Sequence, residues 1–343
     1  MHIAIVGGGI NGFCCAVRIL EHFQANKTPI KVTVISEEFS PNTTGDGSAG
    51  LWGPYLLGGT PTNKVHKWSK GMHDFLQELW LSEDAGEAGV CLIPVVRLST
   101  NDVKVEDFWK DIVYGCAPLA EAELREWSTT RAKKFTDGLH FVTYTSEPLK
   151  LLPYLMKRFQ KNGGKIVQQR VEDLNEIINN DQYDIVINCT GLGSRELLKD
   201  ANMHAVRGQV SRVKANWLYF VVLDESDDGN YIIPNTESVV LGGTHQKDDY
   251  NKVVCPNDKK FIIDGCREIV PGLTNAQHLF DWVGLRPGRT SLRLDVDKNV
   301  KKIIIHNYGH GGSGVTLAWG CAADVLDLLI NEMKNRNLVK SKL

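Results

Sequence analysis

The 343-residue sequence predicts an α/β protein with a discontinuous nucleotide-binding domain and a second domain built on an antiparallel sheet. Three observations predict this class. The N-terminal segment has the pattern of a buried strand, a glycine-rich turn and a helix; strand and helix patterns alternate again between about 138 and 205; and residues 205–250 hold short β-rich segments without helices between them. Strands joined by helices form parallel sheets, whereas strands joined by turns form antiparallel ones.

The N-terminal pattern is the clearest of the three. Residues 3–6 are an apolar run that ends at glycines, as a buried parallel strand does. Apolar residues then recur at helical spacing over 10–23, and residues 31–35 supply a second strand. A loop is predicted over the Gly-, Pro-, Thr- and Ser-rich stretch 40–62, followed by a helix over about 63–80.

The remaining elements complete both domains. Further strands are predicted at 139–144, 165–168, 184–188 and 302–306, with helices at 149–161 and 314–333. We therefore place the nucleotide-binding domain in residues 1–55, 139–204 and 296–335, the second domain in 56–138 and 205–295, and an exposed tail in 336–343.

Composition argues against several classes of partner. A net charge of -2 gives no electrostatic reason to expect a nucleic acid or a membrane surface as partner. No run approaches the ~18 apolar residues of a membrane span. The eight cysteines are scattered without metal-ligand spacing, so we expect buried thiols in a reducing compartment, no disulfides and no metal. The oligomeric state stays open, a homodimer included.

The last three residues form a targeting signal. Ser341-Lys342-Leu343 is the terminal tripeptide that the peroxisomal import receptor binds, and the preceding stretch 334–340 is polar. The alternative is a chance match. The sequence predicts a protein of the peroxisomal matrix.

The glycine-rich turn Gly7-Gly8-Gly9-Ile10-Asn11-Gly12 predicts a dinucleotide site. Its first glycine makes the turn, the second lets the backbone approach a pyrophosphate, and the third lets helix and strand pack closely. Glu37 lies 25 residues beyond Gly12 and suits a ribose hydroxyl pair, so NADP is disfavoured. These residues alone do not distinguish FAD from NAD.

Three further segments resemble the D-amino-acid oxidase family of FAD-dependent enzymes. They are the stretch Asn42-Thr43-Thr44-Gly45-Asp46-Gly47-Ser48-Ala49-Gly50-Leu51-Trp52-Gly53-Pro54-Tyr55, the stretch Val283-Gly284-Leu285-Arg286-Pro287-Gly288-Arg289, and residues 306–316. They follow the family's order, and the resemblance covers nearly the whole chain. It implies a Rossmann-like FAD-binding domain and FAD as cofactor.

The resemblance also implies the flavin contacts. The helix that begins after Gly314 would direct its N-terminus at the pyrimidine edge of the flavin, where it stabilises negative charge. The cofactor-binding residues implied are Gly7, Gly8, Gly9, Ile10, Asn11, Gly12, Ser36, Glu37, Glu38, Thr43, Thr44, Ala49, Gly50, Leu51, Val171, Thr190, Gly191, Gly311, Gly314, Val315 and Thr316.

The substrate contacts follow in the same way. Arg286 matches the arginine that binds the α-carboxylate, Tyr231 a tyrosine that donates to it, and the Gly312 carbonyl an acceptor for the amine. Ser313 and Tyr55 are expected nearby. The family's reaction is hydride transfer to flavin N5, so no acid–base residue is predicted; the products are a 2-oxo acid, ammonia and, from dioxygen, hydrogen peroxide.

The substrate class is where this sequence departs from the family pattern. Residues 84–90, 188–195 and 241–247 resemble the D-aspartate oxidase branch, whereas 50–55 resembles the neutral branch. His245 stands where the acidic branch has an arginine, and histidine binds a carboxylate only while protonated. We expect D-aspartate and D-glutamate as substrates with His245 at the distal carboxylate; the alternatives are a neutral D-amino-acid oxidase, an NAD-dependent dehydrogenase and a non-catalytic flavoprotein.

Overall fold

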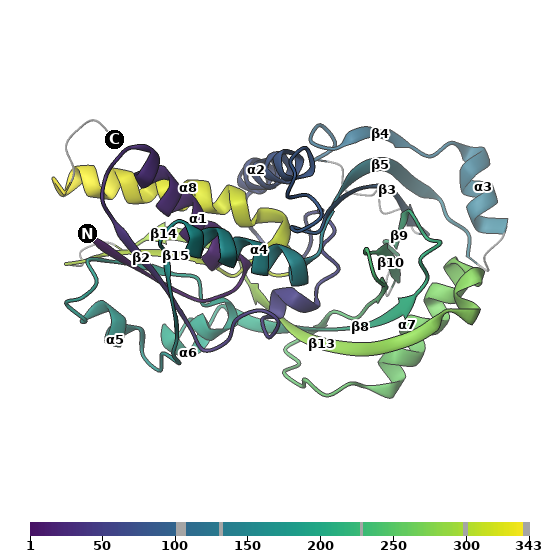
Figure 1. The fold of residues 1–343 in the computed structure, drawn as a ribbon. Helices are drawn as coiled ribbons and strands as arrows, with labels where there is room; N and C mark the ends of the chain where they lie inside the picture. Colours follow the sequence, from purple (N-terminus) through teal and green to yellow (C-terminus); the bar gives the residue numbers. More distant parts are fainter. Residues whose placement is uncertain (101–107, 130–132, 227–228, 298–300, 339–343) are drawn as a thin grey trace.

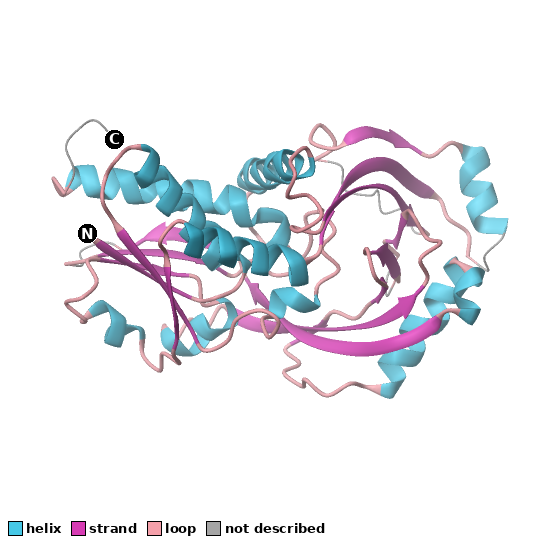
Figure 2. Ribbon diagram, viewed as in Figure 1, coloured by secondary structure: helices cyan, strands magenta, loops and turns pink. Residues whose placement is uncertain are grey.

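The protein is built around two β-sheets (Figure 1). The structure, a computed structural model, describes residues 1–100, 108–129, 133–226, 229–297 and 301–338. The six-stranded sheet has the order β14-β15-β7-β1-β2-β6. The nine-stranded sheet has the order β12-β8-β11-β10-β9-β3-β5-β4, with β13 also paired to β8. Figure 2 shows the first sheet layered between helices and the second curving away beside it. The expected fold class is confirmed.

The six-stranded sheet is mostly parallel and covered on both faces. Helices α1 and α8 lie on one face and the short α5 and α6 on the other (Figure 1). Its strands are β1 (His2–Val6), β2 (Lys31–Ser36), β6 (Lys165–Gln168), β7 (Ile185–Asn188), β14 (Arg293–Val296) and β15 (Ile303–Tyr308). Its helices are α1 (Ile10–Ala25), α4 (Pro148–Lys161), α5 (Leu174–Ile178), α6 (Ser194–Leu197) and α8 (Gly314–Asn335).

Strand β1 shows why the first apolar run is unbroken. Ile3 and Ile5 pack in the cluster that contains α1, whereas Ala4 and Val6 pack in the cluster that contains α5. Both faces of this strand are therefore buried, as in a parallel sheet covered by helices on each side.

The nine-stranded sheet is antiparallel apart from the parallel pair β3–β9. Its strands are β3 (Val90–Ser99), β4 (Tyr114–Pro118), β5 (Asp137–Ser146), β8 (Met203–Lys214), β9 (Val221–Asp224), β10 (Tyr231–Pro234), β11 (Val239–Gly242), β12 (Gln246–Lys247) and β13 (Gln277–Arg289). The remaining helices are α2 (Thr62–Trp80), α3 (Glu121–Thr129), α7 (Pro256–Ile269) and the 3₁₀ turns η1 (Thr44–Gly47), η2 (Gly191–Gly193) and η3 (Pro271–Asn275).

Three elements lie on the other side of the predicted domain division. Strand β5, expected with the nucleotide-binding domain, pairs with β3 and β4 in the second sheet. Strand β14, which begins inside 205–295, pairs with β15 in the first sheet, and helix α2 packs on α8. The apolar pattern of a strand predicts its burial but not its neighbours, because pairing depends on residues far away in sequence.

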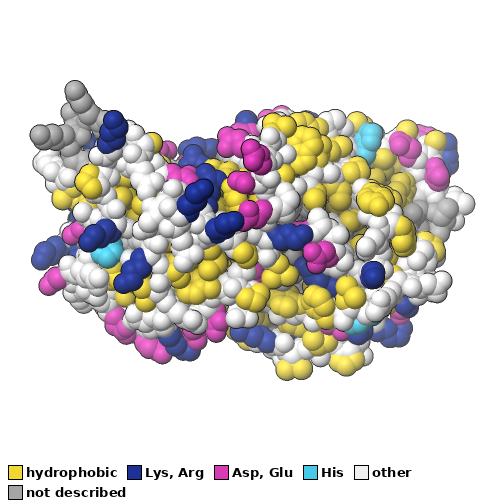
Figure 3. Space-filling model, in the orientation of Figure 1, with side chains coloured by type: hydrophobic (Ala, Val, Ile, Leu, Met, Phe, Trp, Pro, Cys, Tyr) yellow, Lys and Arg dark blue, Asp and Glu magenta, His cyan; other side chains and the backbone are white. Residues whose placement is uncertain are grey.

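Helix α8 is long and apolar enough to cross a membrane, alone among the described helices. In the fold it lies against α1 and α2 instead. A Cβ placed on Gly320 would lie 2.1 Å from the Trp68 carbonyl oxygen of α2, so the two helices touch through their backbones. Its apolar residues therefore belong to the core. On the face drawn in Figure 3, basic and acidic side chains are interspersed.

Candidate functional site

The carboxyl ends of the parallel strands bring most predicted cofactor residues together. Val6 at the end of β1 pairs with Ile35 of β2 and with Asn188 of β7, and Asn188 pairs with His306 of β15. Ligands of open α/β sheets bind at this edge. The predicted cofactor residues lie at or just beyond these strand ends, in segments 7–12, 36–38, 190–191 and 309–316.

The glycine-rich turn leaves open space in front of helix α1. A Cβ on Gly12 would lie 1.9 Å from the Gly7 carbonyl oxygen, and a Cβ on Gly7 would lie 2.3 Å from that of Cys189. These two glycines are required by the packing of the protein itself. A Cβ on Gly9 would meet no atom within 4 Å, so the space before the first turn of α1 is open to a phosphate.

Buried polar atoms around this space lack partners inside the described protein. Asn11 Oδ1 and His310 Nε2 make no hydrogen bond to any described residue. The Asn11 amide nitrogen lies 3.6 Å from the Cβ position of Gly314, so the first turn of α1 meets that of α8. Burial lowers the pKa of His310 to about 3, which keeps the imidazole neutral. This donor and acceptor set fits the polar edge of a flavin better than an apolar ligand.

Glu37, the residue predicted to bind the ribose, lies near the β6 edge of the sheet. Gln168 Nε2 donates to the Glu37 carbonyl oxygen at 3.1 Å, and Arg170 Nη1 donates to Glu37 Oε1 at 3.2 Å. Val171 follows directly and is half-buried. Glu38 accepts a hydrogen bond from Asn42 at 3.2 Å, so this second acid fastens the start of the next loop.

The loop of residues 40–53 is stabilised by the buried carboxylate of Asp46, which was not predicted from the sequence as a functional residue. Asp46 accepts hydrogen bonds from Ser40 Oγ at 2.6 Å, Thr43 Oγ1 at 2.6 Å and the Thr43 N–H at 2.8 Å. The Thr-x-x-Asp spacing is close to a capping box and could have revealed it. Asp46 thus fixes the start of the loop, and later residues of the loop contact the second sheet: Asn235 donates to the Ala49 carbonyl oxygen at 3.0 Å, and Leu51 forms a bridge with Thr145 of β5.

Two hydroxyls tie the end of this loop to helix α8. Ser313 Oγ accepts from the Tyr55 N–H and donates to the Tyr55 carbonyl oxygen, both at 2.6 Å. Thr316 Oγ1 bonds both backbone groups of Gly53, at 3.2 Å and 3.0 Å. Both hydroxyls thus hold the backbone of residues 53–55 against the first turn of α8.

Arg286 and Tyr231 lie close together on the second sheet, beside this junction. The Arg286 guanidinium lies over Gly208, where a Cβ would come within 2.2 Å of Nη1, and Nη1 donates to the Thr244 carbonyl oxygen at 2.9 Å. Burial raises the pKa of Tyr231 although the charge of Arg286 opposes it, so the phenol keeps its proton. A cation and a neutral donor together suit a carboxylate.

Tyr55 and His245 border the same region. Tyr55 is 43% exposed, yet its ring lies against Gly312, where a Cβ would come within 2.4 Å. Burial raises its pKa and the charge of Arg286 opposes the rise, which places the phenol within electrostatic reach of Arg286. His245 follows Thr244 directly and is exposed, with no hydrogen-bond partner among the described residues.

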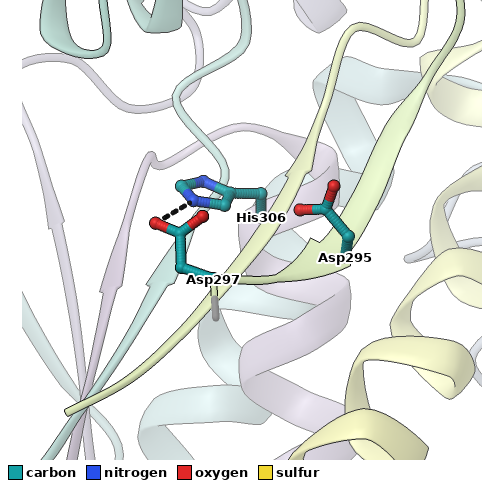
Figure 4. A group of neighbouring side chains, drawn as sticks. All are labelled: Asp295, Asp297 and His306. Atoms are coloured by element: carbon teal, nitrogen blue, oxygen red, sulfur yellow. Dashed lines mark ion pairs between the residues drawn. The ribbon is translucent and has the colours of Figure 1, made fainter. Parts of the chain in front are cut away.

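One cluster has the composition of a metal site but the bonding of an ion network. Asp297 Oδ2 lies 3.0 Å from His306 Nε2, with Asp295 nearby (Figure 4). Arg293 donates to both carboxylates, at 3.0 Å to Asp295 and 2.8 Å to Asp297. Because the Arg293 guanidinium bridges both acids, we assign the cluster to fastening β14 on β15. Arg289 is likewise structural: it donates to Asp200 at 2.9 Å and to the Ser291 carbonyl oxygen at 2.7 Å.

Comparison with known proteins agrees with this geometry. Residues 2–328 match the family described as FAD dependent oxidoreductase. The chain is 39% identical to a D-amino acid oxidase of Dugesia ryukyuensis (96% of this chain, 97% of the relative) and 35% identical to the D-aspartate oxidase of Homo sapiens (95% and 94%). A glycine oxidase from Bacillus cereus has the same fold, with a TM-score of 0.76 at 20% identity, covering 100% of this chain and 99% of that one.

The chain therefore belongs to the family of FAD-dependent oxidoreductases, and FAD is its cofactor. Within that family its class is that of the oxidases of D-amino acids, which act on a CH–NH₂ donor with oxygen as acceptor.

Proposed function

We propose that this oxidase prefers acidic D-amino acids, D-aspartate and D-glutamate, over neutral ones. The assignment of the oxidase site rests on one observation. The Arg286 guanidinium and the Tyr231 phenol lie close together, beside the place where the segment after loop 40–53 contacts α8. The acidic preference is supported by the resemblance of residues 84–90, 188–195 and 241–247 to the D-aspartate oxidase branch, and by the exposed His245 next to Thr244. The relative named D-aspartate oxidase supports it at 35% identity.

The residues present divide the work of binding and orientation. Arg286 and Tyr231 would hold the α-carboxylate, and the Gly312 carbonyl would accept from the amine. FAD, held by the glycine-rich turn 7–12 and by residues 309–316, would supply the redox chemistry, as hydride acceptor from the substrate and electron donor to dioxygen. For each D-amino acid, dioxygen and water consumed, one 2-oxo acid, one ammonia and one hydrogen peroxide are released. Orientation is the protein's contribution, so no acid–base side chain is required.

The test is peroxide release by the purified holoenzyme across D- and L-amino acids. We expect the largest kcat/KM for D-glutamate or D-aspartate, smaller values for D-alanine, and none for the L-enantiomers. A larger value for D-alanine than for both acids would reject the acidic preference and favour the neutral alternative. An enzyme that reduces NAD with another substrate and oxidises no D-amino acid would be a dehydrogenase, and that result would reject the oxidase assignment.

His245 can be tested directly by substitution. If its side chain binds the distal carboxylate of D-aspartate, His245→Asn should raise KM for D-aspartate. KM for D-alanine should not change, because that substrate has no distal carboxylate. An equal change in KM for both substrates, or no change for either, would remove His245 from the site.

We also propose import into the peroxisome through Ser341-Lys342-Leu343, which lies outside the described residues. The support is the tripeptide itself and a reaction that releases peroxide. A fluorescent fusion that keeps these three residues at its carboxyl terminus should enter peroxisomes, and a matched fusion ending in Ser-Glu-Leu should stay outside. Equal distributions of the two fusions would contradict the proposal.

A further inference from the structure

One row of residues crosses four strands of the second sheet and includes Tyr231. Arg97 of β3 pairs with Leu223 of β9, Leu223 pairs with Tyr231 of β10, and Tyr231 pairs with Gly242 of β11. Cross-strand partners project from the same face of a sheet. Arg97 therefore projects from the face that carries Tyr231.

The packing of Arg97 agrees with this placement. Its guanidinium carbon lies 5.2 Å from the ring centroid of Trp109, and Trp109 belongs to the core cluster on which Leu223 and Tyr231 also pack. The Arg97 side chain is only 11% exposed. A mostly buried guanidinium is retained at a cost in desolvation, which is offset when it is paired.

The partner of Arg97 leaves part of the guanidinium free. Nε and Nη2 both donate to the same oxygen of Glu225, at 2.9 Å and 2.7 Å. Nη1 has no hydrogen-bond partner among the described residues, and Glu225 is 32% exposed. The negative charge of Glu225 also contributes to the raised pKa of Tyr55, so the pair lies within electrostatic reach of the residue beside Gly312. An oriented cation with a spare donor thus faces the substrate side of the sheet.

We propose that Arg97 binds the side-chain carboxylate of D-glutamate, the longer of the two acidic substrates, and that Glu225 is the positioning residue for its guanidinium; the His245 assignment concerns the shorter D-aspartate. This inference rests on the proposed function. Arg97 and Tyr231 are two strands apart, which separates their backbones by about 10 Å. A substrate with its α-carboxylate at Tyr231 must extend its side chain past Leu223 to reach Arg97. D-Glutamate, one methylene longer than D-aspartate, spans this gap better, and D-alanine does not reach.

Two variants of the same ion pair test the proposal in opposite directions. Arg97→Gln removes the cation and should raise KM for D-glutamate about tenfold or more, with a smaller rise for D-aspartate and none for D-alanine. Glu225→Gln keeps an oxygen that accepts from Arg97 but removes the negative charge. It should lower KM for D-glutamate roughly two- to fivefold. A merely structural pair predicts instead that both variants lose stability and change all substrates in the same direction.

The control is Arg158→Gln, which breaks a half-buried pair with Glu21 between α4 and α1 (2.6 Å) and should leave the substrate ratios unchanged. A D-glutamate to D-alanine ratio that stays at the wild-type value in both Arg97→Gln and Glu225→Gln would overturn the assignment of Arg97 while leaving the proposed function intact. Failure of the wild-type enzyme to oxidise either acid would overturn both, and is seen before any variant is made.

Discussion

The glycine-rich turn and the Arg97–Tyr231 row bind their ligands with different parts of the chain. The turn uses backbone: Gly9 leaves open space at the start of α1, and the N–H groups of a helix N-terminus suit a phosphate. The row uses side chains from separate strands, brought together by pairing. A backbone site fixes the cofactor and tolerates little change. A side-chain site can be altered one residue at a time, so selectivity should reside there.

The largest effect should follow from filling the space before α1. In Gly9→Val the new Cβ would meet no protein atom within 4 Å, so the apoprotein should fold with little change in Tm. The side chain would occupy the phosphate position, and FAD binding should weaken by about 3 kcal/mol or more, roughly 100-fold. Flavin titration measures this. Gly86→Val, whose Cβ also meets no atom within 4 Å, is the matched control. Unchanged FAD affinity in Gly9→Val would show that the glycine-rich turn does not bind the phosphates of FAD.

The next effect belongs to Arg286, which lies outside the row but close to Tyr231 and is expected to bind the group that every substrate shares. Arg286→Ala should cost about 2–5 kcal/mol in kcat/KM for acidic and neutral D-amino acids alike, because it removes the cation for the α-carboxylate. Bound FAD should be retained. This uniform loss contrasts with the selective changes expected at Arg97. A loss confined to acidic substrates would place Arg286 at the side chain instead.

A smaller effect on FAD binding should follow from a change in loop 40–53. Asp46→Asn replaces one of the accepting oxygens by a donor, so the bonds from Ser40 and Thr43 cannot all be kept. We expect a loss of about 1–3 kcal/mol, seen as faster proteolysis of residues 40–53 and faster FAD release. Asp74→Asn, which breaks an exposed pair with Lys70, serves as comparison. Identical proteolysis of the two variants would show that Asp46 does not hold the loop.

The same contrast explains what the sequence could reveal. The glycine-rich turn lies within residues 7–12, and its glycine spacing is local in sequence. It was therefore predicted together with strand β1 and helix α1. Family resemblance supplied Arg286 and Tyr231, which the structure places together. Arg97 and Glu225 lie 128 positions apart and carry no motif. Their meeting depends on the parallel pairing of β3 with β9, which no local pattern specifies.

The pairing of the strands was the other feature that local sequence patterns did not predict. The predicted strand at 139–144 exists within β5, but its assignment to the nucleotide-binding domain differs from its pairing with β3. Asp46 is a different case, because its spacing from Thr43 was visible in the sequence and only its burial was not.

The most direct test of the account is the bleaching of the bound flavin under nitrogen after mixing the holoenzyme with limiting D-glutamate, D-aspartate or D-alanine. Reduction of the flavin reports hydride transfer without the later reaction with oxygen. We predict reduction by all three, fastest with an acidic substrate, and a selective slowing with D-glutamate in Arg97→Gln. A flavin reduced fastest by D-alanine, or not reduced by any D-amino acid, would contradict it.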